Sequence, residues 1–149
     1  MTAVFTRALK VATFVAALSV APLAASAEMH RVAFQVNDND PQRMNLVLNN
    51  VNNLISAYAE MGDEVEVQIV AYGPGLNMLR ADTSPVAARI AAMSLEHQNV
   101  SFQACNNTIQ GIQRRTGEEV TLLPEATIVP AGVVHLVHLQ EQGWSYIRP

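Results

Sequence analysis

The residue best suited to covalent chemistry in this chain is its single cysteine, Cys105. It lies in the run Val100–Thr108, where an apolar, strand-like stretch gives way to polar residues that typically begin a helix. At such a junction backbone N–H groups and the helix dipole favour an anion, so the thiol is expected to ionise readily and act as a nucleophile. A free cysteine is also among the most buried residue types. Cys105 is therefore the candidate catalytic residue, and an inert core position is the alternative.

Polar and glycine-rich segments follow the first three predicted strands. Ligands of open parallel α/β sheets bind outside the carboxyl ends of the strands, so these segments are expected to meet beside Cys105. The predicted ligand-binding residues are Asn37, Asp38, Tyr72, Gly73, Gly75, Asn106, Asn107 and Thr108. If Asp38 lies close to the thiol, its negative charge opposes formation of the thiolate.

Other chemistry has weaker support in the sequence. His135 and His138 are spaced to share one helix face, but no cysteine or carboxylate accompanies them, so partly buried structural histidines are the better interpretation. Tyr72-Gly73-Pro74-Gly75 has neither the glycine spacing nor the lysine of a phosphate-binding loop, and is typical of a turn. No serine lies in a recognisable nucleophile elbow. The sequence predicts no metal and no cofactor.

Short apolar segments alternate with amphipathic ones along the chain, which predicts an α/β fold with a mostly parallel sheet. The expected strands are His30–Val36, Glu64–Ala71, Asn99–Ala104, Thr127–Pro130 and Trp144–Ile147. The expected helices run from Pro41 to Gly62, from Ser84-Pro85 to about Glu96, from Asn106 to Arg115 and from Ala131 to Gln142, with a short helical piece at Leu76–Leu79. Asp40 and Gly62 are the predicted caps of the first helix.

Residues 1–27 are typical of a cleaved secretory signal peptide. Arg7 and Lys10 precede an apolar stretch, and Ala25-Ser26-Ala27 fits the cleavage site. Cleavage leaves one domain, residues 28–149, in the periplasm. The alternative is an uncleaved membrane anchor, which the proline in a short apolar stretch disfavours.

The charge of the predicted mature domain excludes some partners. Thirteen acidic residues face seven arginines and no lysine, a net charge of −6. Nucleic acid and anionic membrane surfaces are therefore not expected as partners. One cysteine also excludes an intrachain disulfide framework, although a disulfide between chains stays open.

Several short motifs in order resemble the exported branch of the DsrE/DsrF-like family. They are Val36-Asn37 with the asparagine-rich first helix, Val70–Gly75, Phe102–Thr108, Leu123-Pro124, Val129–Val133 and the terminal Trp144–Pro149. The resemblance covers essentially the whole predicted mature chain. It implies a three-layer α/β/α domain with a five-stranded, mostly parallel sheet that assembles into trimers or hexamers.

In the cytoplasmic members of that family, sulfur is passed as a cysteine persulfide in sulfur oxidation and tRNA thiolation. By position, the resemblance makes Cys105 the residue that carries sulfur, with a small sulfur compound or a sulfur-relay protein as partner. The leading hypothesis is therefore a periplasmic sulfur-handling protein. The alternative is a non-enzymatic oligomer that binds a small ligand, in which Cys105 is structural. The Asn49–Asn53 run is either a solvated face or part of a subunit interface.

Overall fold

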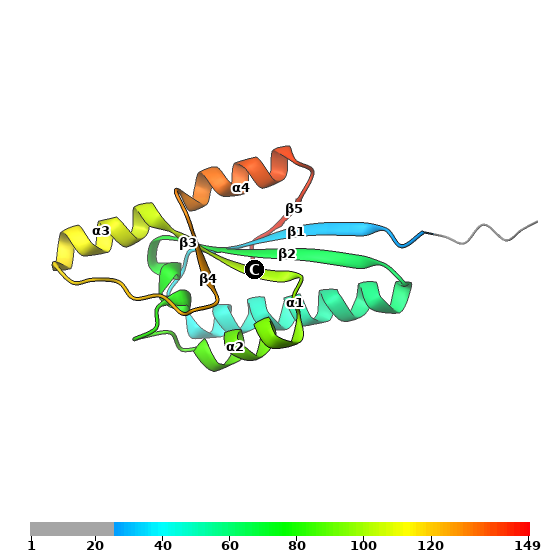
Figure 1. Ribbon diagram of the computed structural model, residues 1–149, viewed down its shortest axis with the longest axis horizontal. Helices are drawn as coiled ribbons and strands as arrows, with labels where there is room; N and C mark the ends of the chain where they lie inside the picture. The colour runs from blue at the N-terminus through cyan, green and yellow to red at the C-terminus, as the bar shows by residue number, and fades with distance from the viewer. Residues whose placement is uncertain (1–25) are drawn as a thin grey trace, which may run out of the picture.

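The computed structural model describes residues 26–149, in which a sheet of five parallel strands forms the centre (Figure 1). The strands are β1 (Met29–Val36), β2 (Glu64–Ala71), β3 (Val100–Cys105), β4 (Ala126–Val129) and β5 (Ser145–Ile147), in the order β4-β3-β2-β1-β5. Residues 1–25 of the predicted signal peptide lie outside the described residues. Within residues 26–149, none of the helices combines the length and apolar character needed to cross a bilayer.

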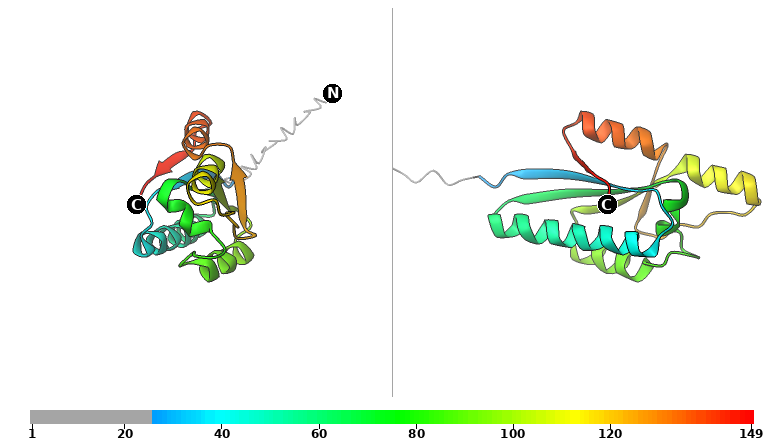
Figure 2. Two further views of the ribbon diagram at one scale, coloured as in Figure 1. Left: turned by 90° about the vertical axis from the view of Figure 1, so that its left-hand side faces the viewer. Right: turned by 180° about the vertical axis from the view of Figure 1, so that it is seen from behind.

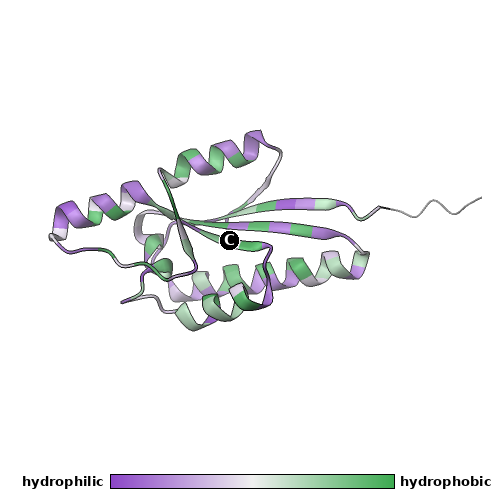
Figure 3. Cartoon of the chain, viewed as in Figure 1, coloured by the Kyte–Doolittle hydropathy of each residue, from purple (hydrophilic) through white to green (hydrophobic). Residues whose placement is uncertain are grey.

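Helices lie on both faces of the sheet, which confirms the predicted α/β fold. Helices α1 (Pro41–Met61) and α2 (Ala87–Glu96) cover one face, and α4 (Gly132–Glu141) covers the other (Figures 1 and 2). The remaining helix, α3 (Asn106–Thr116), extends beyond the carboxyl edge of the sheet and is largely hydrophilic (Figure 3). The short 3-10 helix η1 (Gly73–Leu79) also follows this edge.

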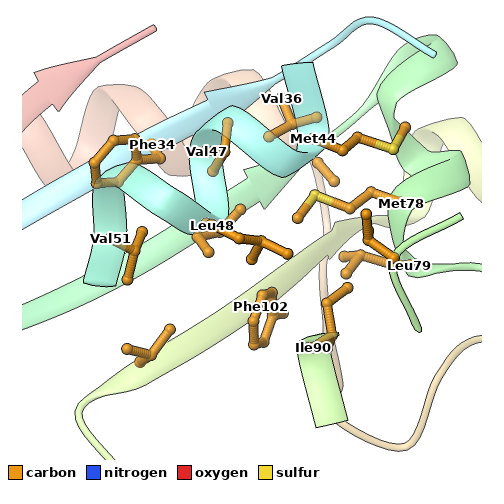
Figure 4. Packing of buried hydrophobic residues seen from close by; sticks show 14 of the residues in the cluster. Phe34, Val36, Met44, Val47, Leu48, Val51, Met78, Leu79, Ile90 and Phe102 are labelled. Carbon is orange, nitrogen blue, oxygen red and sulfur yellow. The ribbon is translucent and has the colours of Figure 1, made fainter. Parts of the chain in front are cut away.

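The larger hydrophobic core lies between the sheet and the layer of α1, η1 and α2. Phe34 and Phe102 meet Met44, Leu48 and other fully buried side chains there (Figure 4). A smaller cluster on the opposite face joins the sheet to α4, and consists of Ala33, Val70, Leu136, Leu139 and Trp144. The central strands β1, β2 and β3 bury side chains on both faces toward their carboxyl ends, so helices are needed on both sides of the sheet.

The parallel register aligns the carboxyl ends of the central strands. Val36 pairs with Ala71, Ala71 with Ala104, and Cys105 with Val129. The segments that follow β1, β2 and β3 therefore leave the sheet at one edge, and this edge carries the candidate site.

Helix boundaries agree with the sequence where the capping residues are strong. Asp40 accepts a hydrogen bond from the Gln42 N–H (2.9 Å), and Gly62 ends α1 in the left-handed conformation at φ 82°. Two details differ from the prediction. The turn after β2 is already helical from Gly73. Helix α2 begins at Ala87, although the Ser84 hydroxyl accepts a hydrogen bond from the Val86 N–H (3.3 Å) in the manner of a cap and also donates to the Met78 carbonyl (2.5 Å).

Candidate functional site

Cys105 is the last residue of β3 and the N-cap residue of α3, as its sequence context predicts. The apolar residues before it continue the central strand, and the polar residues after it start the helix without an intervening loop. Its backbone is extended (φ −73°, ψ 114°), and its side chain is a free thiol that is 5% exposed. The thiol is thus held by the strand on one side and faces the first turn of the helix on the other.

The surroundings of Cys105 favour the thiolate. Burial by itself raises the pKa of the thiol, but hydrogen bonding from the Thr108 hydroxyl and from the N–H groups of Gly132, Thr108 and Asn107 outweighs this effect. The net result is a pKa below the ordinary value for cysteine. A lowered pKa increases the fraction of nucleophilic thiolate at neutral pH.

Thr108 connects the thiol to the segment after β2. Its Oγ1 accepts a hydrogen bond from the Gly73 N–H at 2.9 Å. Because this bond occupies a lone pair of the oxygen, the hydroxyl hydrogen is free to point toward the sulfur of Cys105. The Gly73 N–H therefore fixes the position of a donor to the thiolate.

Gly132 and Tyr72 form the side of the site nearest α4. A Cβ atom at Gly132 would lie 3.1 Å from the Cβ of Tyr72 and 3.3 Å from the Cβ of Cys105. A side chain at this position would make tight contacts with both residues, so glycine suits the close approach of α4. Gly132 contributes to the site through its backbone N–H, and no local sequence pattern pointed to it. Its close approach follows from the pairing of Val129 with Cys105, because the chain passes from the end of β4 directly into α4.

Tyr72 lies between the thiol and a group of charged and phenolic side chains. Burial raises the pKa of its hydroxyl, and Tyr146, Asp38 and Cys105 raise it further, against a lowering effect of Arg148. Asp38 lies 3.4 Å from Arg43 and 3.9 Å from Arg148 (carboxylate oxygen to guanidinium nitrogen).

The sequence suggested that the negative charge of Asp38 would oppose the thiolate if Asp38 lay close to the thiol. The ion pairs of Asp38 alter this expectation. The groups that set the pKa of Cys105 are Thr108, Gly132 and Asn107, while Asp38 is engaged with two arginines. Arg43 also donates to the terminal Pro149 carbonyl at 2.6 Å. Arg43 lies in the first turn of α1 and Arg148 follows β5, so the fold brings the two guanidinium groups to Asp38 from different elements.

The remaining predicted ligand residues divide into two groups. Asn37 and Asn106 are half-buried at the same edge of the sheet, and Asn107 is exposed. Gly75 is different, because it is buried and a Cβ there would lie 2.3 Å from the Val36 carbonyl oxygen. Gly75 lets η1 pack closely on β1, and its contact with a ligand stays a prediction.

The two histidines of α4 are placed as the sequence suggested, on the helix. His135 is half-buried, and its Nε2 lies 2.7 Å from Oε1 of Gln68 on β2. Burial lowers the pKa of His135, and the neighbouring His138 lowers it further. His135 therefore fixes α4 to the sheet through a hydrogen bond.

The comparisons with known proteins identify the family. The model of the DsrE/DsrF-like family matches residues 30–149. The chain belongs to the DsrE/DsrF-like family. It is also similar to a solved structure of a protein of unknown function from Methanobacterium thermoautotrophicum, with 34% identity and a TM-score of 0.69. This match covers 80% of the present chain and 99% of the other. A search among curated proteins finds no match.

The family assignment supports a function related to sulfur relay at a coarse level. The fold predicted from the sequence is confirmed, since the solved relative shares this α/β architecture. Neither comparison assigns a chemical role to Cys105, because the solved relative is itself described as a protein of unknown function.

Proposed function

We propose that this member of the DsrE/DsrF-like family handles sulfur in the periplasm, with Cys105 as the thiol that carries it as a persulfide. The observation that supports this proposal most directly is the set of donors around the buried sulfur, which lowers the pKa of Cys105 despite burial. The same donors stabilise Sγ as the thiolate, both as the nucleophile that accepts sulfur and as the leaving group when the outer sulfur is passed on.

The chemical step is attack of the Cys105 thiolate on the outer sulfur of a polysulfide or of thiosulfate. With thiosulfate, a sulfur–sulfur bond forms to Cys105 while the sulfur–sulfur bond of the donor breaks. Its electron pair leaves with sulfite. The product is a persulfide anion on Cys105, and no external oxidant or reductant is needed. An acceptor thiolate then removes the outer sulfur by the same type of exchange.

Intact mass spectrometry of the mature protein tests this function. Incubation with polysulfide or thiosulfate is expected to add one sulfur atom, about 32 Da, that dithiothreitol removes. Cys105→Ser is the matched control and is expected to show no addition. If the wild-type protein gains no sulfur while the thiol still reacts with iodoacetamide, sulfur transfer through Cys105 is wrong.

A second function is favoured by the low exposure of the thiol. Cys105 is 5% exposed, which is typical of a core residue, and a non-enzymatic oligomer that binds a small ligand at this edge would need no reactive sulfur. In that case Cys105→Ser leaves ligand binding intact, and iodoacetamide labels the wild-type protein only after unfolding. The labelling experiment therefore separates the two functions.

We also propose that the protein is a homo-oligomer, a trimer or hexamer. The feature that supports assembly is an exposed apolar surface on α4, where Val133, Val134 and Val137 are 54%, 51% and 46% exposed. Monomeric proteins rarely expose a contiguous apolar patch without a partner. Sedimentation velocity of the mature protein is expected to give three or six subunits. Val133→Asp with Val137→Asp is expected to give monomers, and Leu95→Asp, also at an exposed apolar residue, serves as control.

Export is proposed from residues 1–27. Expression of the full chain in a bacterium is expected to place a protein beginning at Glu28 in the periplasmic fraction. Recovery of the uncleaved chain in membranes would support the anchor instead. Once cleaved, the domain is expected to associate with neither membrane nor nucleic acid.

A further inference from the structure

A cavity of about 550 Å³ lies between η1 and α3, next to the thiol site but distinct from it. Its walls come from the segment after β1, from η1 and from the exposed side of α3. Three residues belong to both places: Thr108 and Gly73 line the cavity and form the hydrogen bond that positions the donor to Cys105, and Asn107 lines the cavity and donates its N–H to Cys105. Because α3 extends beyond the sheet (Figure 1), no further layer of the fold fills this space.

The cavity is open because one face of α3 lacks side-chain bulk. A Cβ atom added at Gly111 would meet no heavy atom within 4 Å. Opposite this position, the Asn77 amide donates to Asn39 Oδ1 at 2.8 Å and fixes η1 to the segment after β1. The wall formed by η1 and the wall formed by α3 are positioned by separate contacts, so the cavity is part of the folded structure.

The charged residues that line the cavity are two arginines. Arg80 and Arg115 line it, and no carboxylate is among its lining residues in the described part of the chain. Arg80 is held by Asp82, with nitrogen–oxygen distances of 3.0 and 2.5 Å. Within residues 26–149, no carboxylate lies within ion-pair distance of Arg115. Asp82 balances the charge of Arg80, so Arg115 is the positive charge that the cavity offers to a ligand, in a chain whose net charge is negative.

The size and the polar groups of the cavity indicate the kind of ligand. A volume of about 550 Å³ is within the range of sites for small organic molecules and exceeds what a single inorganic oxyanion fills. The side chains of Asn39, Asn77 and Asn107 offer both donors and acceptors. Guanidinium groups recognise carboxylates and other oxyanions in a bidentate manner.

We propose that this cavity binds a small polar organic anion, whose carboxylate or other oxyanion group is held by Arg115 with Arg80. The proposal depends on the cavity and its charges and needs no reaction at Cys105. Its connection with the proposed function is that Thr108 and Gly73 are shared, which places a bound organic anion beside the thiol site.

The test uses S-methylglutathione, an organic dicarboxylate that cannot exchange sulfur, and sulfate as an inorganic probe. Binding is followed by amide chemical shifts in the mature Cys105→Ser protein, so that its outcome is independent of thiol chemistry. Saturable shifts at Gly73, Gly111 and neighbouring amides are expected with S-methylglutathione, and weaker binding with sulfate.

Arg115→Gln is expected to weaken binding about tenfold, because it removes a charged hydrogen-bond donor. Arg114→Gln is the matched control, since it removes the same charge from the adjacent position of α3 but does not line the cavity. Absence of saturable shifts with S-methylglutathione, saturation by sulfate alone, or equal weakening by both substitutions would overturn the proposal.

Discussion

The hydroxyl of Thr108 is the side-chain group that most directly favours the thiolate of Cys105. We predict that Thr108→Val slows alkylation of Cys105 at neutral pH. The substitution keeps the shape of the side chain but removes the donor to the sulfur. It also removes the acceptor of the Gly73 N–H, which lies 2.9 Å from Oγ1.

The size of the effect follows from the charge of the acceptor. A hydrogen bond to a charged group contributes about 1.5–3 kcal/mol, and about 1.4 kcal/mol corresponds to a tenfold change in the thiolate fraction. Below the pKa of the thiol, alkylation by iodoacetamide is therefore expected to slow roughly 10- to 100-fold. The rate at high pH changes little, because the thiol is then ionised in both proteins. The unpaired Gly73 N–H is expected to lower the free energy of unfolding by about 1–3 kcal/mol.

The assay is the pH dependence of iodoacetamide labelling, quantified by intact mass on protein shown to be folded by circular dichroism. Thr108→Ser keeps the hydroxyl and is expected to retain the wild-type profile. Thr116→Val changes the same residue type on the same helix, where the hydroxyl bonds to the Ile112 carbonyl (3.0 Å), and is expected to have no effect on labelling. A folded Thr108→Val protein with the wild-type labelling profile would refute the argument that Thr108 stabilises the thiolate.

Three further predictions concern stability. Gly75→Ala places a methyl group against the Val36 carbonyl and is expected to lower the free energy of unfolding, measured in urea, by about 1–3 kcal/mol or more. Gly111→Ala adds a methyl group in open space within α3 and is expected to raise the free energy of unfolding by about 0.5–1 kcal/mol. Equal effects of the two substitutions would contradict this prediction. Phe102→Ala empties the centre of the larger core and is expected to cost about 3–5 kcal/mol in the same measurement, so a loss below about 1 kcal/mol would disagree with its complete burial. Burial raises the pKa of Cys105, but the donors around it outweigh this and lower it, so the folded protein releases the thiol proton at a lower pH than the unfolded chain. The free energy of unfolding of the wild-type protein, relative to that of Cys105→Ala, should thus increase as the pH rises from the folded pKa of Cys105 toward about 8.5, the ordinary value for cysteine. This added stability should be lost as the pH falls through the folded pKa. Urea unfolding of both proteins across this pH range tests the direction of the change.

Much of the fold could be predicted from local patterns. The alternation of short apolar and longer amphipathic segments predicts parallel strands joined by helices, and the caps Asp40 and Gly62 determine the limits of α1. Prediction was less accurate at the start of α2. Ser84 accepts a hydrogen bond from the Val86 N–H as a cap does, but the intervening residues form a turn and α2 starts only at Ala87.

The sequence by itself determined that one cysteine stands where a strand becomes a helix, and which polar segments follow the first three strands. These features depend on residue order and on the geometry common to all parallel sheets. Only the tertiary structure decided which groups surround the sulfur. Gly132 reaches Cys105 and Tyr72 because β4 pairs with β3 and leads directly into α4, and Arg115 faces a cavity because α3 leaves the sheet edge. Such contacts join residues far apart in the chain, and their distances are set by the packing of both faces of the sheet, which local propensity does not encode.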